Sequence, residues 1–191
     1  MAATSPIRSK QQVRALAEYY IKRKQPRNHV LIVLGVHTAL RVSDLLRLTW
    51  EDVYDTKRSR VRKSVSIAES KTGKRKTFTL NSRVVTALKH LYNSVKPEPG
   101  GFLFENPRTG RAIGRVQAFR IIRDASESLD LGRVSCHSLR KTFGYHAWKS
   151  GVSPAVIMEI YNHSSFDITR RYLGVTQDDK DDVYRKMAKL I

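Results

Sequence analysis

Apolar residues recur at helical spacing along most of the chain, which predicts a mainly helical protein. Between residues 10 and 24, Val13, Leu16 and Tyr20 fall on one helical face with basic residues between them. Pro26 interrupts this pattern, and a more apolar stretch from 27 to 40 predicts a second helix. The first forty residues are therefore expected to form two helices, of which the second is the more apolar.

Polar residues mark where the later helices are expected to begin. Asn81 and Ser135 are predicted to cap helices that run to about 94 and about 149, and another helix is predicted from 114 to about 129. The other predicted starts are Ser43, Thr49 with Asp52, Ser153 with Pro154, Ser164 with Asp167, and Thr176 with Asp179.

One segment instead alternates with the period of a β-strand. Apolar and polar residues alternate over 61–68, and residues 77–80 continue in the same style. A polar turn that contains glycine lies between them, so a basic β-hairpin is predicted. The expected fold class is mainly α with one small antiparallel β-sheet (α+β), in a single domain that spans residues 1–191.

The strongest compositional signal is charge. The chain has 36 Lys and Arg residues against 17 Asp and Glu, a formal net charge of +19, which attracts polyanions. Nucleic acid, an anionic membrane surface and an acidic protein are all compatible with that charge. The longest apolar run, Val30–Val36, is far shorter than the ~20 residues that cross a bilayer. Nucleic acid is therefore the favoured partner.

The first ten residues contain no apolar core of the signal-peptide kind. Cys136 is the only cysteine, which excludes an internal disulfide and a zinc site built from several cysteines. These features favour a cytosolic protein, or a nuclear one in a host that has a nucleus.

Arg41 is the first candidate for a functional site, because it follows the apolar helix and precedes the predicted start at Ser43. A charge at the junction of two buried helices needs an anionic partner, since an unpaired buried charge is costly. A structural ion pair with Asp44 or Glu51 would meet that need. A phosphate group held by the guanidinium fork would meet it equally.

His137 and Arg140 are the next candidates. They stand three residues apart near a predicted helix start, so both face the same side of the helix. A helix N-terminus also favours an anion through its free N–H groups. The pair therefore suits a phosphate, although a core histidine beside a surface arginine is the commoner explanation of this spacing.

Three further residues complete the candidate set. Lys71 lies at the tip of the predicted hairpin, His163 precedes a predicted helix start, and Tyr172 lies nine residues later in that helix. Taken singly, such a lysine is an ordinary exposed cation and such a tyrosine a half-buried packing residue. The basic residues expected to contact DNA are Lys74, Arg75, Lys76, Arg170 and Arg171.

The order of these residues is more specific than any one of them. An arginine, a hairpin lysine, H-x-x-R, a histidine and a tyrosine follow one another in TALRVSDLL, ESKTGKRKTFTL, CHSLRKTF and NHSSFDITRRYLG. On these matches the chain resembles the catalytic domain of the tyrosine recombinase (phage integrase) family, over essentially its full length. The resemblance implies the fold of the DNA breaking-rejoining enzymes.

Two departures accompany the resemblance. Tyr161-Asn162 stands before the histidine, where many family members have Leu-Gly. Members usually carry a core-binding domain, and often an arm-binding domain, ahead of the catalytic domain. We expect both to be absent, and an excised fragment and a naturally minimal member both fit that expectation.

The resemblance also implies a reaction. Arg41 and Arg140 would clamp the scissile phosphate, and Tyr172 would attack it to form a 3′-phosphotyrosyl link and release a 5′-hydroxyl. Lys71 would protonate the leaving oxygen, and His137 would accept a proton. The other histidine of the set, in the NHSSF motif, would hydrogen-bond the phosphate. The implied activity is site-specific DNA recombination (integration or excision) without a metal ion, ATP or any other cofactor.

The implied partners are double-stranded DNA and further copies of the chain in a synaptic tetramer, with no membrane. A tail helix over about 176–191 would join the copies through Val183, Met187 and Leu190. The resemblance places the protein in the cytoplasm, encoded by a bacterium or phage and associated with the nucleoid. The alternatives are relaxation of supercoils by a type IB topoisomerase-like enzyme, a noncatalytic DNA-binding regulator, and a basic RNA or ribosomal-type binder.

Overall fold

The structure is a computed structural model that describes residues 4–98 and 100–188. Within these residues the chain is mainly helical and has two antiparallel sheets of two strands each. The predicted α+β class is confirmed, with a second small sheet beside the expected one. The helices are α1 (Lys10–Lys22), α2 (Pro26–His37), α3 (Val42–Leu46), α4 (Trp50–Val53), α5 (Ser82–Val95), α6 (Arg115–Ser128), α7 (Cys136–Lys149), α8 (Pro154–Tyr161), α9 (Phe166–Leu173) and α10 (Gln177–Met187). The strands are β1 (Tyr54–Asp55), β2 (Arg60–Val61), β3 (Ser64–Ala68) and β4 (Arg75–Thr79).

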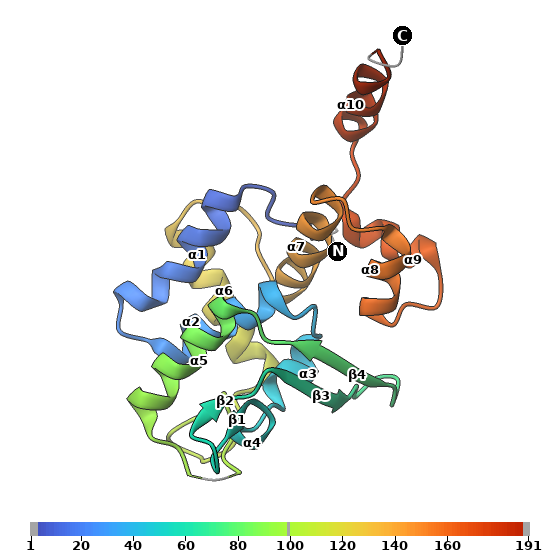
Figure 1. Cartoon of the computed structure of the whole chain (residues 1–191). Coiled ribbons are helices and arrows are strands. Elements are labelled where there is room, and N and C mark those ends of the chain that lie inside the picture. The colour runs from blue at the N-terminus through green and yellow to red at the C-terminus, as the bar shows by residue number, and fades with distance from the viewer. Residues whose placement is uncertain (1–3, 99, 189–191) are drawn as a thin grey trace.

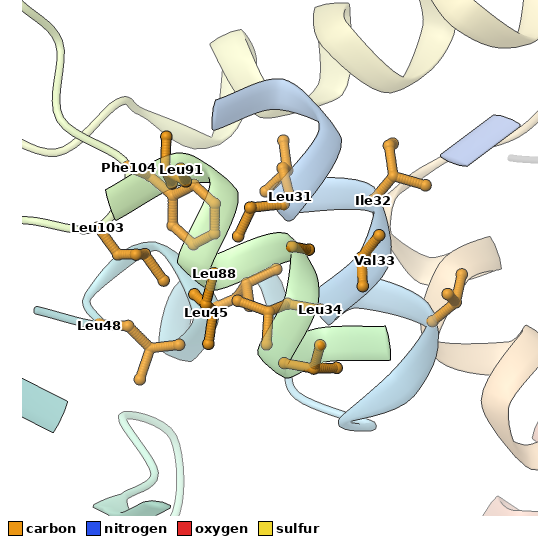
Figure 2. Close-up of a cluster of buried hydrophobic side chains, with 14 of the residues drawn as sticks. Leu31, Ile32, Val33, Leu34, Leu45, Leu48, Leu88, Leu91, Leu103 and Phe104 are labelled. Carbon is orange, nitrogen blue, oxygen red and sulfur yellow. The ribbon is translucent and has the colours of Figure 1, made fainter. Parts of the chain in front are cut away.

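Helix α2 is the centre of the main hydrophobic core. Its residues from Val30 to Val36 are all buried, as expected for a helix that is apolar on every side. α1, α5 and α7 pack around it (Figure 1), and Figure 2 shows leucines of α2 and α5 meeting those of α3 and the Leu103–Phe104 segment. Gly35 faces α7, where an added Cβ would lie 2.7 Å from Leu139 Cδ1, so this glycine lets the two helices approach closely.

A second, smaller cluster lies beneath the C-terminal helices. Ala39, Ile157, Tyr161 and Leu173 form it, and all four are fully or almost fully buried. α7 packs against α2 on the side of the main core and against α8 and α9 on the side of this cluster. The position of α9 relative to α2 is therefore set through α7.

The β3–β4 hairpin has the predicted polar turn, and its register runs from Ser64 opposite Thr79 to Ala68 opposite Arg75. The predicted first strand was too long at its start. Residues 60–61 belong to β2, which pairs with β1 instead, because a turn after Asp55 reverses the chain there.

Most of the predicted helix starts are confirmed. Asn81, Ser135 and Ser153 cap α5, α7 and α8 through their side-chain oxygens, and the Thr49 and Thr176 capping boxes both form. Two starts were wrong. α3 begins after Arg41, so Ser43 lies inside it, because the extended Arg41 already offers its carbonyl to the N–H groups of Asp44 and Leu45. α9 begins after Ser165, which has the extended backbone of an N-cap residue, rather than after Ser164.

The N-terminal segment before α1 fastens α7 to the end of α9. Thr142 Oγ1 accepts a hydrogen bond from Ile7 N at 2.9 Å, and Lys141 Nζ donates to Thr4 O at 2.5 Å. Arg8 Nη2 donates to Gly174 O at 2.7 Å, just beyond α9. These contacts hold the helix that carries Tyr172 against the rest of the chain.

Helix α10 projects away from the other helices (Figure 1). Its start is fixed by Asp179, whose Oδ1 lies 2.5 Å from Lys149 Nζ on α7. Val183, Tyr184 and Met187 are exposed along it, while Leu190, also predicted for its apolar face, lies outside the described residues. No helix within residues 4–98 and 100–188 is both long enough and apolar enough to cross a lipid bilayer.

Candidate active site

Arg41 lies in the short segment between α2 and α3. Ala39 has a left-handed backbone (φ 55°), which turns the chain sharply, and Arg41 itself is extended. Arg41 Nη1 lies 2.7 Å from Oε1 of Glu69, whose side chain is fully buried. The anionic partner is thus Glu69 rather than Asp44 or Glu51, the two carboxylates considered from the sequence.

The hairpin turn that carries Lys71 is tied to α3 by Asp44. The buried Asp44 accepts two hydrogen bonds through Oδ1, from Ser70 N at 2.7 Å and from Ser70 Oγ at 2.5 Å. Thr72 Oγ1, on the other side of the lysine, donates to Glu69 Oε2 at 2.8 Å. Lys71 is exposed between these two anchors. The base of the turn is therefore fixed, and the lysine side chain at its tip is free to move.

Arg140 lies beneath the site and is only 2% exposed. Its guanidinium donates through Nη1 to the carbonyl of Ala39 and through Nη2 to the carbonyl of Tyr161 at 3.1 Å. His137 stands one helical turn earlier on α7 and is exposed. Arg140 therefore joins the segment before α3 to the end of α8, with His137 above it at the surface.

His163 and Tyr172 come from the α8–α9 loop and from α9. Asn162 ends α8 with a left-handed backbone (φ 53°), which turns the chain into His163. His163 Nδ1 lies 3.0 Å from Oγ1 of the buried Thr169, which leaves Nε2 for a ligand. The imidazole and the Tyr172 ring have their centroids 4.8 Å apart. The two side chains therefore lie next to each other on the same side of the site.

A single cleft of about 980 Å³ collects these residues. Every residue singled out by the motif order lines it: Arg41, Lys71, His137, Arg140, His163 and Tyr172. They reach it from the α2–α3 segment, the hairpin turn, α7, the α8–α9 loop and α9. Segments far apart in the sequence thus place three kinds of group in one space: cations, imidazoles and a phenol.

Burial and the nearby cations lower the pKa values of the two histidines in the cleft. Burial, followed by the charges of Arg140, Arg41 and Lys76, lowers the pKa of His163 to about 4. Partial desolvation, with the charges of Arg140 and Lys141, also lowers the pKa of His137. Both imidazoles are therefore neutral at pH 7 in the free protein, and a neutral imidazole can accept a proton.

The five basic residues predicted to contact DNA have different surroundings. Lys74 lines the cleft, whereas Arg75 lies on the hairpin and its Nε donates to Ser66 Oγ at 2.8 Å. Arg170 and Arg171 are exposed on α9. These four are open to solvent, and Arg170 also lies 3.7 Å from Asp167 Oδ1 in an exposed ion pair.

Lys76 corrects the sequence prediction, which placed it in solvent with the other hairpin cations. It is 6% exposed, and its Nζ donates to Ala39 O at 3.1 Å. Burial, followed by the charge of Arg140, lowers its pKa to about 7. The physical reason is strand alternation, because Lys76 shares the inward face of the hairpin with Phe78 and Leu80. That alternation was already visible in the sequence.

Three residues of the site have roles that the sequence did not predict. Glu69 pairs with Arg41, Asp44 anchors the hairpin turn, and Tyr161 stacks on His163 with 4.9 Å between ring centroids. Asp44 was considered from the sequence only as an ion-pair partner of Arg41, and it binds Ser70 of the hairpin turn instead. The role of Glu69 depends on tertiary packing, which local sequence does not report.

No group of three or more His, Cys, Asp or Glu side chains suited to a metal ion occurs in the part of the chain that the structure describes.

Comparison with known proteins identifies the family. Residues 7–178 match the phage integrase family. Over 190 residues the chain is 32% identical to YoeC, a probable integrase/recombinase of Bacillus subtilis (strain 168), with 100% of both chains covered. It is 28% identical to a tyrosine recombinase of Pseudothermotoga lettingae, covering 93% of this chain and 59% of that protein. The chain thus spans the whole of the Bacillus relative and a little over half of the Pseudothermotoga one.

Solved structures share the fold. XerA recombinase superposes with a TM-score of 0.78 at 21% identity, over 97% of this chain and 66% of that one. XerH recombinase, solved with its palindromic difH substrate after cleavage, gives 0.74 at 19% identity, over 98% and 53%. The catalytic domain of bacteriophage HP1 integrase gives 0.66 at 18% identity, over 95% of each chain. With a family match over most of its length and this fold, the chain belongs to the phage integrase family and is a tyrosine recombinase.

Proposed function

We propose that this chain cuts and rejoins double-stranded DNA through a covalent bond between Tyr172 and a backbone phosphate, and so carries out site-specific recombination. The observation that supports this most strongly is the convergence of the six motif residues on one cleft. Each of them has an ordinary structural explanation when taken alone. Those explanations give no reason for all six to line the same space.

Arg41 and Arg140 are the residues proposed to bind the phosphate. A guanidinium has five N–H donors, and backbone carbonyls accept from two of those on Arg140. Its Nε is buried and has no hydrogen-bond partner within residues 4–98 and 100–188, so donors remain for phosphate oxygens. Arg41 lies at the cleft surface, with 19% of its side chain exposed, and supplies the second guanidinium. Positive charge fixed in advance around the reacting phosphate stabilises the charge that develops in the transition state.

The proposed reaction is a transesterification. The Tyr172 hydroxyl loses its proton to His137 while its oxygen bonds to phosphorus, and the bond from phosphorus to the 5′-oxygen breaks. Lys71 donates a proton to the departing oxygen, which becomes a 5′-hydroxyl. His163 donates from Nε2 to a non-bridging oxygen, which requires that its Nδ1 accept from Thr169. A 5′-hydroxyl from a partner duplex then reverses these steps and seals the exchanged strand.

This chemistry needs no external energy source, because one phosphoester bond replaces another at each step. We therefore propose that ATP is not consumed. The cations of the cleft supply the charge that a metal ion supplies in other phosphoryl-transfer enzymes. We propose on that ground that the reaction proceeds without a metal ion.

Duplex DNA is the proposed substrate. The net charge of +19 and the exposed cations beside the cleft suit a polyanion. The similar Tn1549 transposon integrase was solved in complex with circular intermediate DNA, and we propose the same class of substrate here. We further propose that the protein acts on the nucleoid of a bacterium, encoded by the cell or by a phage.

Recombination joins two duplexes, so we propose that several copies of the chain assemble on DNA as a synaptic tetramer. Helix α10 is the element suited to link them, because it projects from the other helices and exposes Val183, Tyr184 and Met187 (Figure 1). Apolar side chains on one extended helix are suited to a groove on a neighbouring copy.

Covalent trapping tests this proposal. A duplex with a nick just downstream of the cleavage position loses its short fragment on cleavage, so a protein–DNA adduct accumulates even when cleavage is slow. The cognate sequence is first selected from a random duplex library. The native chain and Tyr19→Phe, a control on α1 outside the cleft, should form the adduct, and Tyr172→Phe should not. An adduct that survives Tyr172→Phe would contradict the assignment of the nucleophile.

The same reagents separate the rival functions. A topoisomerase-like enzyme would relax a supercoiled plasmid without exchanging strands between two labelled duplexes. A noncatalytic regulator would bind the selected sequence and form no adduct. Exchange between labelled duplexes is the result that the recombinase proposal predicts.

A further inference from the structure

Tyr161, the last residue of α8, is fully buried against the proposed catalytic residues. Its ring lies 4.9 Å from the His163 ring at an interplanar angle of 23°, and 5.1 Å from the Tyr172 ring. The guanidinium carbon of Arg140 lies 4.4 Å from the same ring centroid. One side chain therefore contacts three of the six motif residues.

The polar atoms of Tyr161 bind Arg140 at two points. Its hydroxyl donates to the backbone carbonyl of Arg140 at 2.6 Å, and its own carbonyl accepts from Arg140 Nη2 at 3.1 Å. Burial raises the pKa of the Tyr161 phenol although the charge of Arg140 opposes it, so the hydroxyl stays a neutral donor. The backbone and the side chain of Arg140 are thus both held by one residue.

Gly144 on α7 makes room for this arrangement. A Cβ added at Gly144 would overlap Tyr161 Oη and lie 3.1 Å from two carbons of its ring. A glycine inside a helix destabilises it relative to alanine, so its presence needs a local reason. The Tyr161 hydroxyl is that reason, and the two residues form a matched pair across α7 and α8.

We propose that Tyr161 is a positioning residue for the cleavage reaction, and that Gly144 is the condition for its presence. Tyr161 holds the Arg140 guanidinium and the His163 imidazole beside the position that the scissile phosphate would occupy. This inference rests on the proposed function and deepens it. Many family members have Leu in place of this tyrosine, and a leucine cannot make the ring stack or the hydroxyl contact.

The ring of Tyr161 also shields His163 from water. The other groups that face this imidazole are Arg140 of α7, Arg41 before α3, Lys76 of β4, Glu69 of the hairpin turn and Tyr172 of α9. Tyr161→Leu opens space beside the imidazole, so the pKa of His163 should rise from about 4 toward its ordinary 6.5. Tyr161→Phe keeps the ring and should leave that pKa unchanged.

An NMR titration of the His163 ring tests this without DNA, with the signal assigned by its loss in His163→Asn. The native chain and Tyr161→Phe should give matching pKa values, and Tyr161→Leu a value higher by about one unit or more. Equal pKa values of His163 in the native chain and in Tyr161→Leu would overturn the proposal that Tyr161 shields and positions this imidazole.

A double-mutant cycle tests the positioning role. Gly144→Ala should slow adduct formation by about 10- to 100-fold, while DNA affinity changes little, because a misplaced Arg140 affects the reacting phosphate more than duplex capture. In the Tyr161→Leu background, Gly144→Ala should not slow adduct formation further, because the Tyr161 hydroxyl that the alanine Cβ would overlap is absent. If Gly144→Ala slowed adduct formation equally in both backgrounds, the proposal that Gly144 makes room for Tyr161 would be refuted.

Two further outcomes are distinguishable. If Gly144→Ala alone fails to fold, the thermal midpoint of unfolding is measured instead of the rate. Gly144→Ala should raise that midpoint in the Tyr161→Leu background, because alanine favours a helix more than glycine. A lower midpoint there would refute the proposed pairing of Gly144 with Tyr161. If the native chain forms no adduct, the proposed function fails, whereas the His163 titration still decides the contact with Tyr161.

Discussion

Arg41 Nη1 lies 2.7 Å from Glu69 Oε1, in an ion pair whose carboxylate is fully buried. The pair joins the segment before α3 to the hairpin turn that carries Lys71. Burial would raise the pKa of Glu69, but the ion pair with Arg41 and the hydrogen bond from Thr72 outweigh it and lower that pKa below its ordinary 4.5. Because the folded-state pKa is the lower one, the pair stabilises the fold above pH 4.5. That stabilisation is lost as the pH falls through the folded-state value.

Glu69→Gln should therefore loosen the hairpin and release Arg41. We expect the free energy of unfolding in urea to fall by about 1–3 kcal/mol at pH 7, since a buried charge loses its partner. Adduct formation should slow, whereas DNA affinity should not weaken, because the protein becomes more positive. Glu18→Gln, on the exposed face of α1, is the matched control. Unchanged stability and unchanged cleavage in Glu69→Gln would show that the pair has neither role.

Lys71 is predicted to protonate the 5′-oxygen that leaves. Lys71→Ala should slow cleavage by about 10²- to 10⁴-fold. A substrate with sulfur at the 5′-bridging position should restore much of that rate, because a thiolate leaves without a proton. Lys74→Ala, in the same turn and also lining the cleft, should weaken DNA binding with little effect on the cleavage rate. Failure of the sulfur substrate to rescue Lys71→Ala would assign the lysine another role.

Lys76 should make stability depend on pH in the alkaline range. Its pKa is about 7 in the folded chain and 10.5 ordinarily, chiefly because it is buried. Between these values the unfolded chain binds the proton more strongly, so the free energy of unfolding should rise with pH. Urea unfolding at several pH values in this window should show that rise in the native chain and a flatter curve in Lys76→Met. The exposed Lys74→Met should keep the native slope, and an equal slope in Lys76→Met would exclude Lys76 as its source.

The projecting α10 is predicted to join copies on DNA. A truncation after Val175 removes α10 together with the Lys149–Asp179 pair. It should leave cleavage of a single nicked site largely intact and abolish the cooperative assembly of two duplexes, as seen in native gels. Val183→Glu in the full chain, which leaves the Asp179 cap in place, should reproduce the loss of assembly. Undiminished cooperativity in the truncated chain would exclude α10 as the link.

Local sequence was sufficient to predict the helices and most of their starts. Side-chain caps such as Asn81 and Ser135 act over three or four residues, so their effect is visible within a short window. The motif residues could be assembled because their order resembles that of a known family. The six residues line one cleft, and their catalytic roles stay a prediction.

Local sequence was not sufficient where partners come from distant segments. Arg41 pairs with Glu69, 28 positions away, because the hairpin turn folds back onto α3. Lys76 is buried because its strand face turns inward, against an expectation based on charge alone. Tyr161 stood out in the sequence only as a departure from a family pattern. Its position shows that the departure lies next to Arg140 and His163.

The most direct test of the covalent mechanism is to identify the residue that carries the DNA. The trapped adduct is digested with nuclease and trypsin, and the peptides that retain a nucleotide are sequenced by mass spectrometry. We predict a 3′-linked nucleotide on Tyr172, within the tryptic peptide that covers residues 172–180. A nucleotide on any other residue, or no modified peptide from a confirmed adduct, would contradict Tyr172 as the nucleophile.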